Sequence, residues 1–168
     1  MLLKSAIRDP NPVVFLEHKG LYRHVRDEVP EGEYTVPIGE ARVAREGGEL
    51  TVIAYGSAVP LALAAAEALE EDIEVIDLRT LCPLDDEAIL ASVRKTGKVL
   101  IAHEATGSCG VGAEVAALIG AEAFEDLDGP IRRLTAADVP IPFSPPLEQE
   151  VLPQLDDMKE ACRELLAY

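Results

Sequence analysis

The sequence predicts an α/β fold with three layers, in which a mostly parallel sheet carries helices on both faces. Segments typical of strands alternate with segments typical of helices three times between residues 50 and 125, and this alternation favours right-handed βαβ crossovers. The expected strands are apolar throughout, as in a sheet covered on both faces. With 168 residues, 48% of them hydrophobic and 27% charged, the chain is long enough for one such domain.

The first predicted unit is a strand over residues 50–56 (LTVIAYG) followed by a helix over about 58–70 that is rich in alanine and leucine. Ser57 stands directly before the helix and is a good N-cap residue. A second strand follows over 73–80 (IEVIDLRT). The spacing is that of a βα unit that begins to repeat.

The next two helices complete the repeat. Asp85 is the expected N-cap of a helix that ends at Gly97, since glycine readily adopts the left-handed conformation that closes a helix. A third strand is predicted over 98–105 (KVLIAHEA), and the glycine loop 107–112 leads into a helix over about 113–125.

The last part of the chain predicts a short strand over 131–134, a proline-rich segment over 139–146, and a final helix capped near Asp156 or Asp157. Upstream of the repeats, residues 12–17 (PVVFLE) form an apolar run after a turn-rich stretch and predict a strand. It is separated from the repeats by a long segment in which apolar residues do not recur with the period of a helix or of a strand. This leading strand therefore looks like the tail of a preceding domain.

The charge of the chain limits its partners. Fifteen basic and 31 acidic residues give a formal net charge of −16, which repels phosphate backbones and anionic lipid headgroups. Nucleic acid and membranes are therefore not expected as partners, whereas a basic protein is. No apolar run reaches the ~20 residues of a membrane span, and the N-terminus lacks a signal pattern. We expect a cytoplasmic protein, or a mitochondrial matrix protein if the source is eukaryotic.

The carboxyl end of the third predicted strand places His103 and Glu104 near Cys109. Histidine can activate a thiol, so a cysteine-dependent hydrolase is one alternative, although a buried structural cysteine is the simpler interpretation. The loop 107–112 reads GxxGxG and not GxGxxG, and it does not open the domain, so tight packing explains it better than dinucleotide binding does.

One further group offers ligands for a hard cation. Asp9 and Asn11 lie two residues apart in the stretch RDPNP, and a carboxylate with an amide oxygen suits such an ion. Residues of these types more often form turns. The spacing alone leaves both interpretations open.

Long stretches of the chain resemble the β subunits of thiamine-diphosphate-dependent 2-oxo acid and acetoin dehydrogenases. The resemblance covers essentially the whole chain. It is carried by DPNPVVFLEHKGLYR (9–23), VPEGEYTVPIGEARVAREGGELTVIAYG (29–56), EVIDLRTLCPLDDEAILASVRKTGKVLIAHEA (74–105), GPIRRLTAADVPIPFSPPLE (129–148) and the closing LP and LLAY.

The resemblance implies that residues 1–20 are the remnant of an upstream pyrimidine-binding domain, 21–40 a linker, and 41–168 a domain like the C-terminal domain of transketolase. It also implies an α2β2 parent enzyme that uses thiamine diphosphate and magnesium for oxidative decarboxylation. The groups that orient this cofactor would lie on the α subunit and the missing half. No catalytic or cofactor-binding residue is therefore expected in this chain, which would be inactive alone, as an excised fragment or the product of a split or truncated gene.

The partners that the resemblance implies are the α subunit, a second β subunit and the small basic subunit-binding domain of a lipoyl acyltransferase. The acidic composition agrees with the last of these, because complementary fields steer encounter. Glu125, Asp126 and Asp128, with the last helix and its end at Tyr168, are the expected docking face. A self-contained scaffold or regulatory domain is the alternative in a different class.

The resemblance also implies a structural potassium ion. AIRDPNP (6–12) is similar to the potassium-binding stretch of this family. The backbone carbonyl of Ala6 and the side chains of Asp9 and Asn11 would then be ligands, together with groups from the upstream segment. The substrate stays open among pyruvate, branched-chain 2-oxo acids and acetoin.

Overall fold

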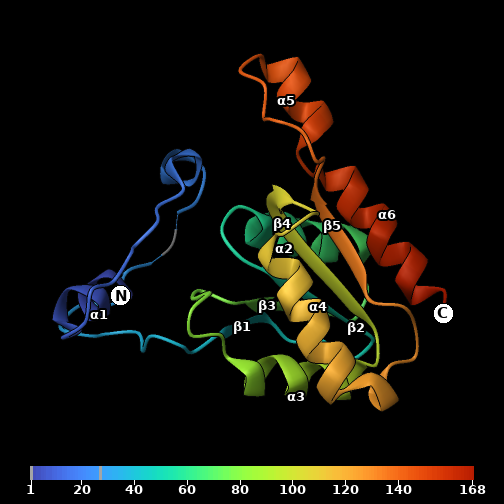
Figure 1. Cartoon of the computed structure of the whole chain (residues 1–168), viewed down its shortest axis with the longest axis horizontal. Helices are drawn as coiled ribbons and strands as arrows, with labels where there is room; N and C mark the ends of the chain where they lie inside the picture. The colour runs from blue at the N-terminus through green and yellow to red at the C-terminus, as the bar shows by residue number, and fades with distance from the viewer. Residues whose placement is uncertain (1, 27) are drawn as a thin grey trace.

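The computed structural model describes residues 2–26 and 28–168 and contains one five-stranded sheet (Figure 1). The strand order is β1-β3-β2-β4-β5. β2 (Leu50–Ala54), β3 (Ile73–Asp77), β4 (Val99–Thr106) and β5 (Arg132–Ala136) pair in parallel, and β1 (Arg42–Arg45) joins β3 antiparallel at one edge. The predicted mostly parallel sheet is confirmed.

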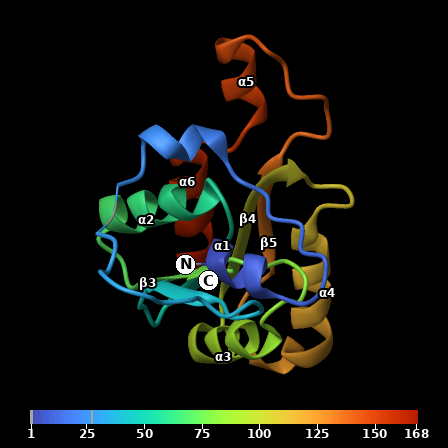
Figure 2. The same ribbon diagram turned by 90° about the vertical axis from the view of Figure 1, so that its left-hand side faces the viewer.

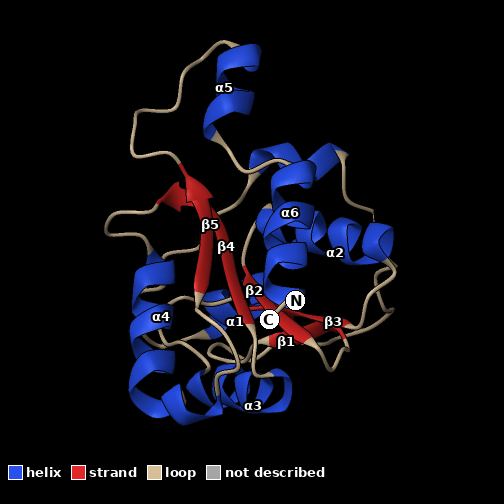
Figure 3. Ribbon diagram, turned by 90° about the vertical axis from the view of Figure 1, so that its right-hand side faces the viewer, coloured by secondary structure: helices blue, strands red, loops and turns tan. Residues whose placement is uncertain are grey.

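Helices cover both faces of this sheet, as predicted (Figure 3). α2 (Ala58–Leu69) and α6 (Leu155–Leu166) lie on one face, and α3 (Asp86–Thr96) and α4 (Val111–Glu122) lie on the other. Each face has its own apolar core: one joins alternate residues of the strands to α2 and α6, and the other joins the remaining strand residues to α3 and α4. No helix in the described part of the chain is long and apolar enough to cross a membrane.

The predicted helix ends have mixed outcomes. Asp85 caps α3 as expected: its Oδ1 accepts from the Ala88 N–H at 3.0 Å, and its Oδ2 accepts from the Ala41 N–H at 2.8 Å. Gly97 ends the helix with a left-handed φ of 67°. Ser57 stands at the N-cap of α2 as predicted, but its side chain does not cap the helix. The residue has helical dihedrals, and its buried hydroxyl has no hydrogen-bond partner among the described residues.

The predicted strand over residues 12–17 is also wrong. These residues have no strand assignment, and Val14 and Leu16 are 85% and 86% exposed. A strand needs a neighbour to satisfy its backbone groups, and the sheet ends at β1 and β5 without reaching this segment. An apolar run bounded by prolines has the composition of a strand, but composition cannot supply the partner.

Several elements were not predicted. They are β1 and four short helices: α1 (Leu2–Arg8), the 3₁₀ turns η1 (Lys19–Arg23) and η2 (Phe124–Asp126), and α5 (Pro145–Val151). Two prolines occupy the first positions of α5, where a missing N–H costs no hydrogen bond. α6 begins earlier than predicted, because Gln154 is the N-cap and its backbone N–H donates to Asp157 Oδ2 at 2.8 Å.

The segment before β1 lies at one side of the body (Figures 1 and 2). Backbone N–H groups at its end anchor it, since Gly39 donates to Thr80 Oγ1 at 3.1 Å. A second anchor is the hydrogen bond between His18 Nε2 and Glu104 Oε2 at 2.8 Å, at the end of β4. α5 projects beyond the ends of β4 and β5.

Candidate functional site

The carboxyl end of β4 carries a buried histidine whose two ring nitrogens are both bonded. His103 Nε2 accepts the Gly112 N–H at 3.1 Å, and His103 Nδ1 lies 3.1 Å from the Ala105 carbonyl oxygen. An acceptor at Nε2 and a donor at Nδ1 define a neutral imidazole. Burial lowers the pKa of His103 in agreement. His103 therefore has a structural role at the end of β4.

The glycine loop 107–112 packs against the His103 side chain. A Cβ at Gly112 would lie 2.5 Å from His103 Nε2, and a Cβ at Gly110 would lie 2.3 Å from the Thr106 carbonyl oxygen. Close approach therefore explains these glycines, as the simpler interpretation of the sequence held. Ser108 anchors the loop, since its hydroxyl and N–H both donate to the Asp138 carboxylate and lower the pKa of Asp138.

This arrangement does not support a cysteine nucleophile. Cys109 is exposed and has a left-handed φ of 60°, but His103 cannot accept its proton while Gly112 occupies Nε2. Glu104 is paired with His18 instead. Cys162 is buried in the core, and burial raises its pKa to about 12. Cys162 is therefore a structural thiol, as expected, whereas Cys82 and Cys109 are exposed.

The residues of the predicted cation site lie together at the end of α1. Asp9 Oδ1 accepts from the Asn11 N–H at 2.8 Å and from Asn11 Nδ2 at 3.0 Å, which closes the turn. Among the described residues, the other Asp9 carboxylate oxygen and the Asn11 amide oxygen accept no hydrogen bond. Ala6 lies in the last part of α1. The oxygen donors of this turn fit a hard cation.

The predicted docking residues are neighbours in space. Tyr168, 69% exposed, packs beside Gly129, where a Cβ would lie 3.3 Å from the tyrosine Cγ. Asp128 precedes this glycine and is exposed, as is Glu125. Asp126 pairs with Arg94 at 3.5 Å. The structure thus joins the end of α6 to the acidic turn before β5 in one continuous surface.

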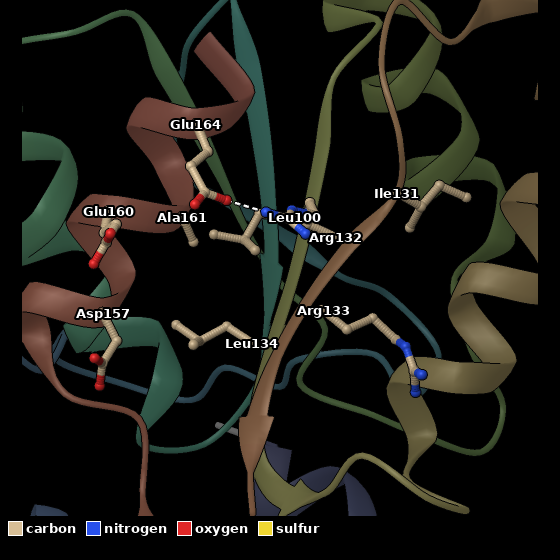
Figure 4. Close-up of a pocket in the computed structure, with 9 residues that line it drawn as sticks. All are labelled: Leu100, Ile131, Arg132, Arg133, Leu134, Asp157, Glu160, Ala161 and Glu164. Carbon is tan, nitrogen blue, oxygen red and sulfur yellow. Dashed lines mark hydrogen bonds and ion pairs between the residues drawn. The ribbon is translucent and has the colours of Figure 1, made fainter. Parts of the chain in front are cut away.

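A groove that sequence reasoning missed adjoins this surface (Figure 4). It lies between the edge strand β5 and α6, has a volume of about 470 Å³, and has Leu100, Leu134 and Ala161 among its apolar lining residues. Figure 4 shows Arg132 reaching from β5 to Glu164 on α6, with which it forms an ion pair.

The α6 side of the groove is acidic. Asp157, Glu160 and Glu164 recur at helical spacing along it, and all three are exposed. The spacing was visible in the sequence, but nothing there indicated that a strand edge would lie opposite.

His103 and the glycine loop at the carboxyl end of β4 are thus engaged in packing, and the acidic residues around the C-terminus are exposed. The groove has an apolar floor, carboxylates on its α6 side, and Arg132 and Arg133 on its β5 side. The described residues include no cluster of three or more histidine, cysteine, aspartate or glutamate side chains able to hold a metal ion.

The chain is similar in sequence to subunits of known dehydrogenases. The chain is 47% identical over 99% of its length to the 2-oxoisovalerate dehydrogenase subunit beta of Bacillus subtilis, and 48% identical over 99% to the pyruvate dehydrogenase E1 component subunit beta of the same organism. The corresponding Staphylococcus aureus subunit is 46% identical. The chain spans about half the length, 52%, of each of these relatives.

Solved structures show the same fold. A split-gene transketolase described as an inactive beta4 tetramer matches 84% of this chain and 46% of its own, with a TM-score of 0.70 and 28% identity. The 2-oxoglutarate:ferredoxin oxidoreductase of Magnetococcus marinus matches 76% of the chain with a TM-score of 0.50 and 12% identity, which indicates a shared fold alone. The family described as transketolase, C-terminal domain, matches residues 39–158, well over half of the chain. The chain belongs to the transketolase C-terminal domain family.

Proposed function

We propose that this chain is an assembly and docking part of the β subunit of the decarboxylating component of a 2-oxo acid dehydrogenase complex. The observation that carries the proposal is the similarity over 99% of the chain to β subunits of two such enzymes. The parent enzyme would decarboxylate a 2-oxo acid oxidatively with thiamine diphosphate and magnesium. Identities of 47% and 48% do not separate a branched-chain substrate from pyruvate.

In this proposal residues 1–20 are the last piece of the pyrimidine-binding domain, 21–40 the linker, and 41–168 the transketolase-like domain. The start of the family match at residue 39 supports the second boundary. The high exposure of Ile7, Val14 and Leu16 suits a piece whose remaining neighbours belong to another domain. The cofactor would be held by the α subunit and that domain, because His103 and the glycine loop at the end of β4 are engaged in packing. The bacterial relatives suit a cytoplasmic complex.

The proposed partners are the α subunit, a second β subunit and the basic subunit-binding domain of the lipoyl acyltransferase. The beta4 tetramer of the similar split-gene transketolase supports contact between β subunits. The acidic surface formed by Glu125, Asp128 and the end of α6 at Tyr168 supports acyltransferase docking, because opposite charges steer association.

Binding of the isolated acyltransferase domain tests this docking. We expect the double variant Glu125→Lys, Asp128→Lys to weaken binding by about tenfold or more, because the partner would meet like charge. Calorimetric titration at two salt concentrations measures the effect, and salt should weaken wild-type binding. Glu49→Lys with Glu71→Lys, at exposed sites before β2 and β3, carries the same charge change and should bind normally. An absence of wild-type binding at low salt would favour the free-standing scaffold.

We also propose that Ala6, Asp9 and Asn11 contribute to a potassium site. Potassium chloride should then raise the melting temperature more than sodium chloride at equal ionic strength, since an ion that binds the folded state stabilises it. Asp9→Ala should abolish that difference, whereas Glu31→Ala, at an exposed acid in the same segment, should keep it. Equal melting temperatures of the wild type in both salts would contradict a site in this chain.

A further inference from the structure

Two segments that the proposed docking surface does not use lie at the same end of the molecule. Residues 19–26, here the basic segment, include η1; residues 139–151, here the acidic arm, include α5. Figures 1 and 2 show both near the end of the sheet where β4 and β5 stop. Their positions allow a second molecule that approaches this end to meet both.

The basic segment is positively charged, whereas the chain as a whole is negatively charged. Lys19, Arg23 and Arg26 are exposed, and no acidic residue occurs between residues 19 and 26, in a chain with a net charge of −16. Tyr22 and Val25 are 61% and 49% exposed and add apolar surface between the cations. The hydrogen bond of the preceding His18 with Glu104 holds the segment beside the end of β4.

The acidic arm has the complementary character. It contains no lysine, arginine or histidine, and its two carboxylates, Glu148 and Glu150, are exposed. Ile141 is 54% exposed, Leu147 57%, and Phe143 is fully exposed. Large apolar side chains grouped beside charges are typical of a protein contact surface and costly to leave in water.

The two segments are not matched to each other within one molecule. No described hydrogen bond or ion pair joins residues 19–26 to residues 139–151. The acidic arm is tied to the body at its base, where the Ala137 N–H donates to the Val151 carbonyl at 3.1 Å. Each segment therefore presents apolar surface and one sign of charge toward solvent.

We propose that the basic segment of one copy binds the acidic arm of a second copy, and that the same contact forms in reverse. The inference rests on the proposed function, in which β subunits meet, and names the surface they use. In a twofold dimer every contact occurs twice. The basic segment and the acidic arm of each copy would therefore both be paired with the other copy. Two bodies of charge −16 repel each other elsewhere, so this complementary pair determines the orientation.

Charge reversal tests the pairing. Variant one is Lys19→Glu, Arg23→Glu, Arg26→Glu, and variant two is Glu148→Lys, Glu150→Lys. Sedimentation velocity should show a wild-type dimer and, for each variant alone, a dissociation constant raised at least ~10-fold. An equimolar mixture of the two variants should restore the dimer, because both contacts then join opposite charges. Restoration also shows that the variants are folded.

Glu49→Lys with Glu71→Lys is the matched control for variant two, since it makes the same charge change, at exposed sites before the first residues of β2 and β3. It should leave the dimer intact. A wild-type chain that is monomeric at every concentration tested overturns the proposal, as does a mixture of variants that stays monomeric. The variants lie outside the acyltransferase surface at Glu125 and Asp128. Loss of the dimer with retained acyltransferase binding therefore separates this inference from the proposed function.

Discussion

Gly47→Ala is expected to destabilise the folded chain by about 3 kcal/mol, the upper range for forcing extra atoms into a packed site. A Cβ at this position would lie 2.2 Å from the Glu74 nitrogen and 2.3 Å from the Ile73 carbonyl carbon. Both atoms belong to the backbone at the start of β3, which is held between β1 and β2. The clash cannot be relieved by rotating a side chain, so the strand itself would have to move.

Gly120→Ala is the matched comparison. Gly120 is exposed within α4, and nothing lies within 4 Å of a Cβ built there. Alanine in an exposed helix interior should stabilise by up to about 1 kcal/mol relative to glycine. Urea denaturation followed by circular dichroism measures both variants. If Gly47→Ala proved as stable as the wild type, the close approach of the two backbones would be wrong.

Lys95→Met is expected to cost about 2 kcal/mol. Glu74, only 1% exposed, forms an ion pair with Lys95 and accepts a hydrogen bond from Ser92 Oγ. Removing the partner of a buried charge costs about 3–5 kcal/mol, and the half-exposed side chain of Lys95 reduces this through solvent screening. Thr51 extends the network, with its Oγ1 2.7 Å from Ser92 Oγ.

The double variant Glu74→Leu, Lys95→Met should recover part of this loss, since no unpaired charge then remains buried. Lys159→Met is the control: its partner Asp156 is 91% exposed, so the effect should stay below about 1 kcal/mol. Thermal denaturation measures all three variants. A double variant less stable than Lys95→Met would contradict the assignment.

The pair also predicts a pH dependence. The hydrogen bond with Glu74 raises the pKa of Lys95 above its ordinary value of 10.5. A raised pKa in the folded state stabilises the fold fully below the unfolded pKa, and this contribution is lost as the pH rises through the folded pKa. The stability difference between the wild type and Lys95→Met should therefore shrink above about pH 10.5.

Local signals predicted the local structure well. The cap at Asp85, the end of α3 at Gly97 and the strand and helix alternation all depend on residues close together in the chain. The helix α5 was missed because residues 139–146 were described only as a proline-rich segment, although prolines occupy the first positions of this helix. The failed strand at residues 12–17 shows the limit of composition, since strand formation requires a partner.

The candidate site was predictable only in part. Tyr168 and Asp128 were named together as one docking face, and the structure places the chain end beside Gly129. The groove beside them was missed, because Arg132 and Glu164 are 32 residues apart and meet through the packing of α6 on β5. His18 and Glu104, 86 residues apart, are paired in the same way.

The sequence by itself determined the fold class, the order of the parallel repeats, the acidic character of the surface and the family. The first three follow from periodicity, capping and composition, which act along the chain, and the family follows from the resemblance of long stretches of the sequence. The tertiary structure alone decided the pairing of Glu74 with Lys95, the engagement of both His103 nitrogens, and the exposure of two oppositely charged segments at one end. Such contacts depend on strand order and register, because only these bring residues distant in sequence within a few ångströms.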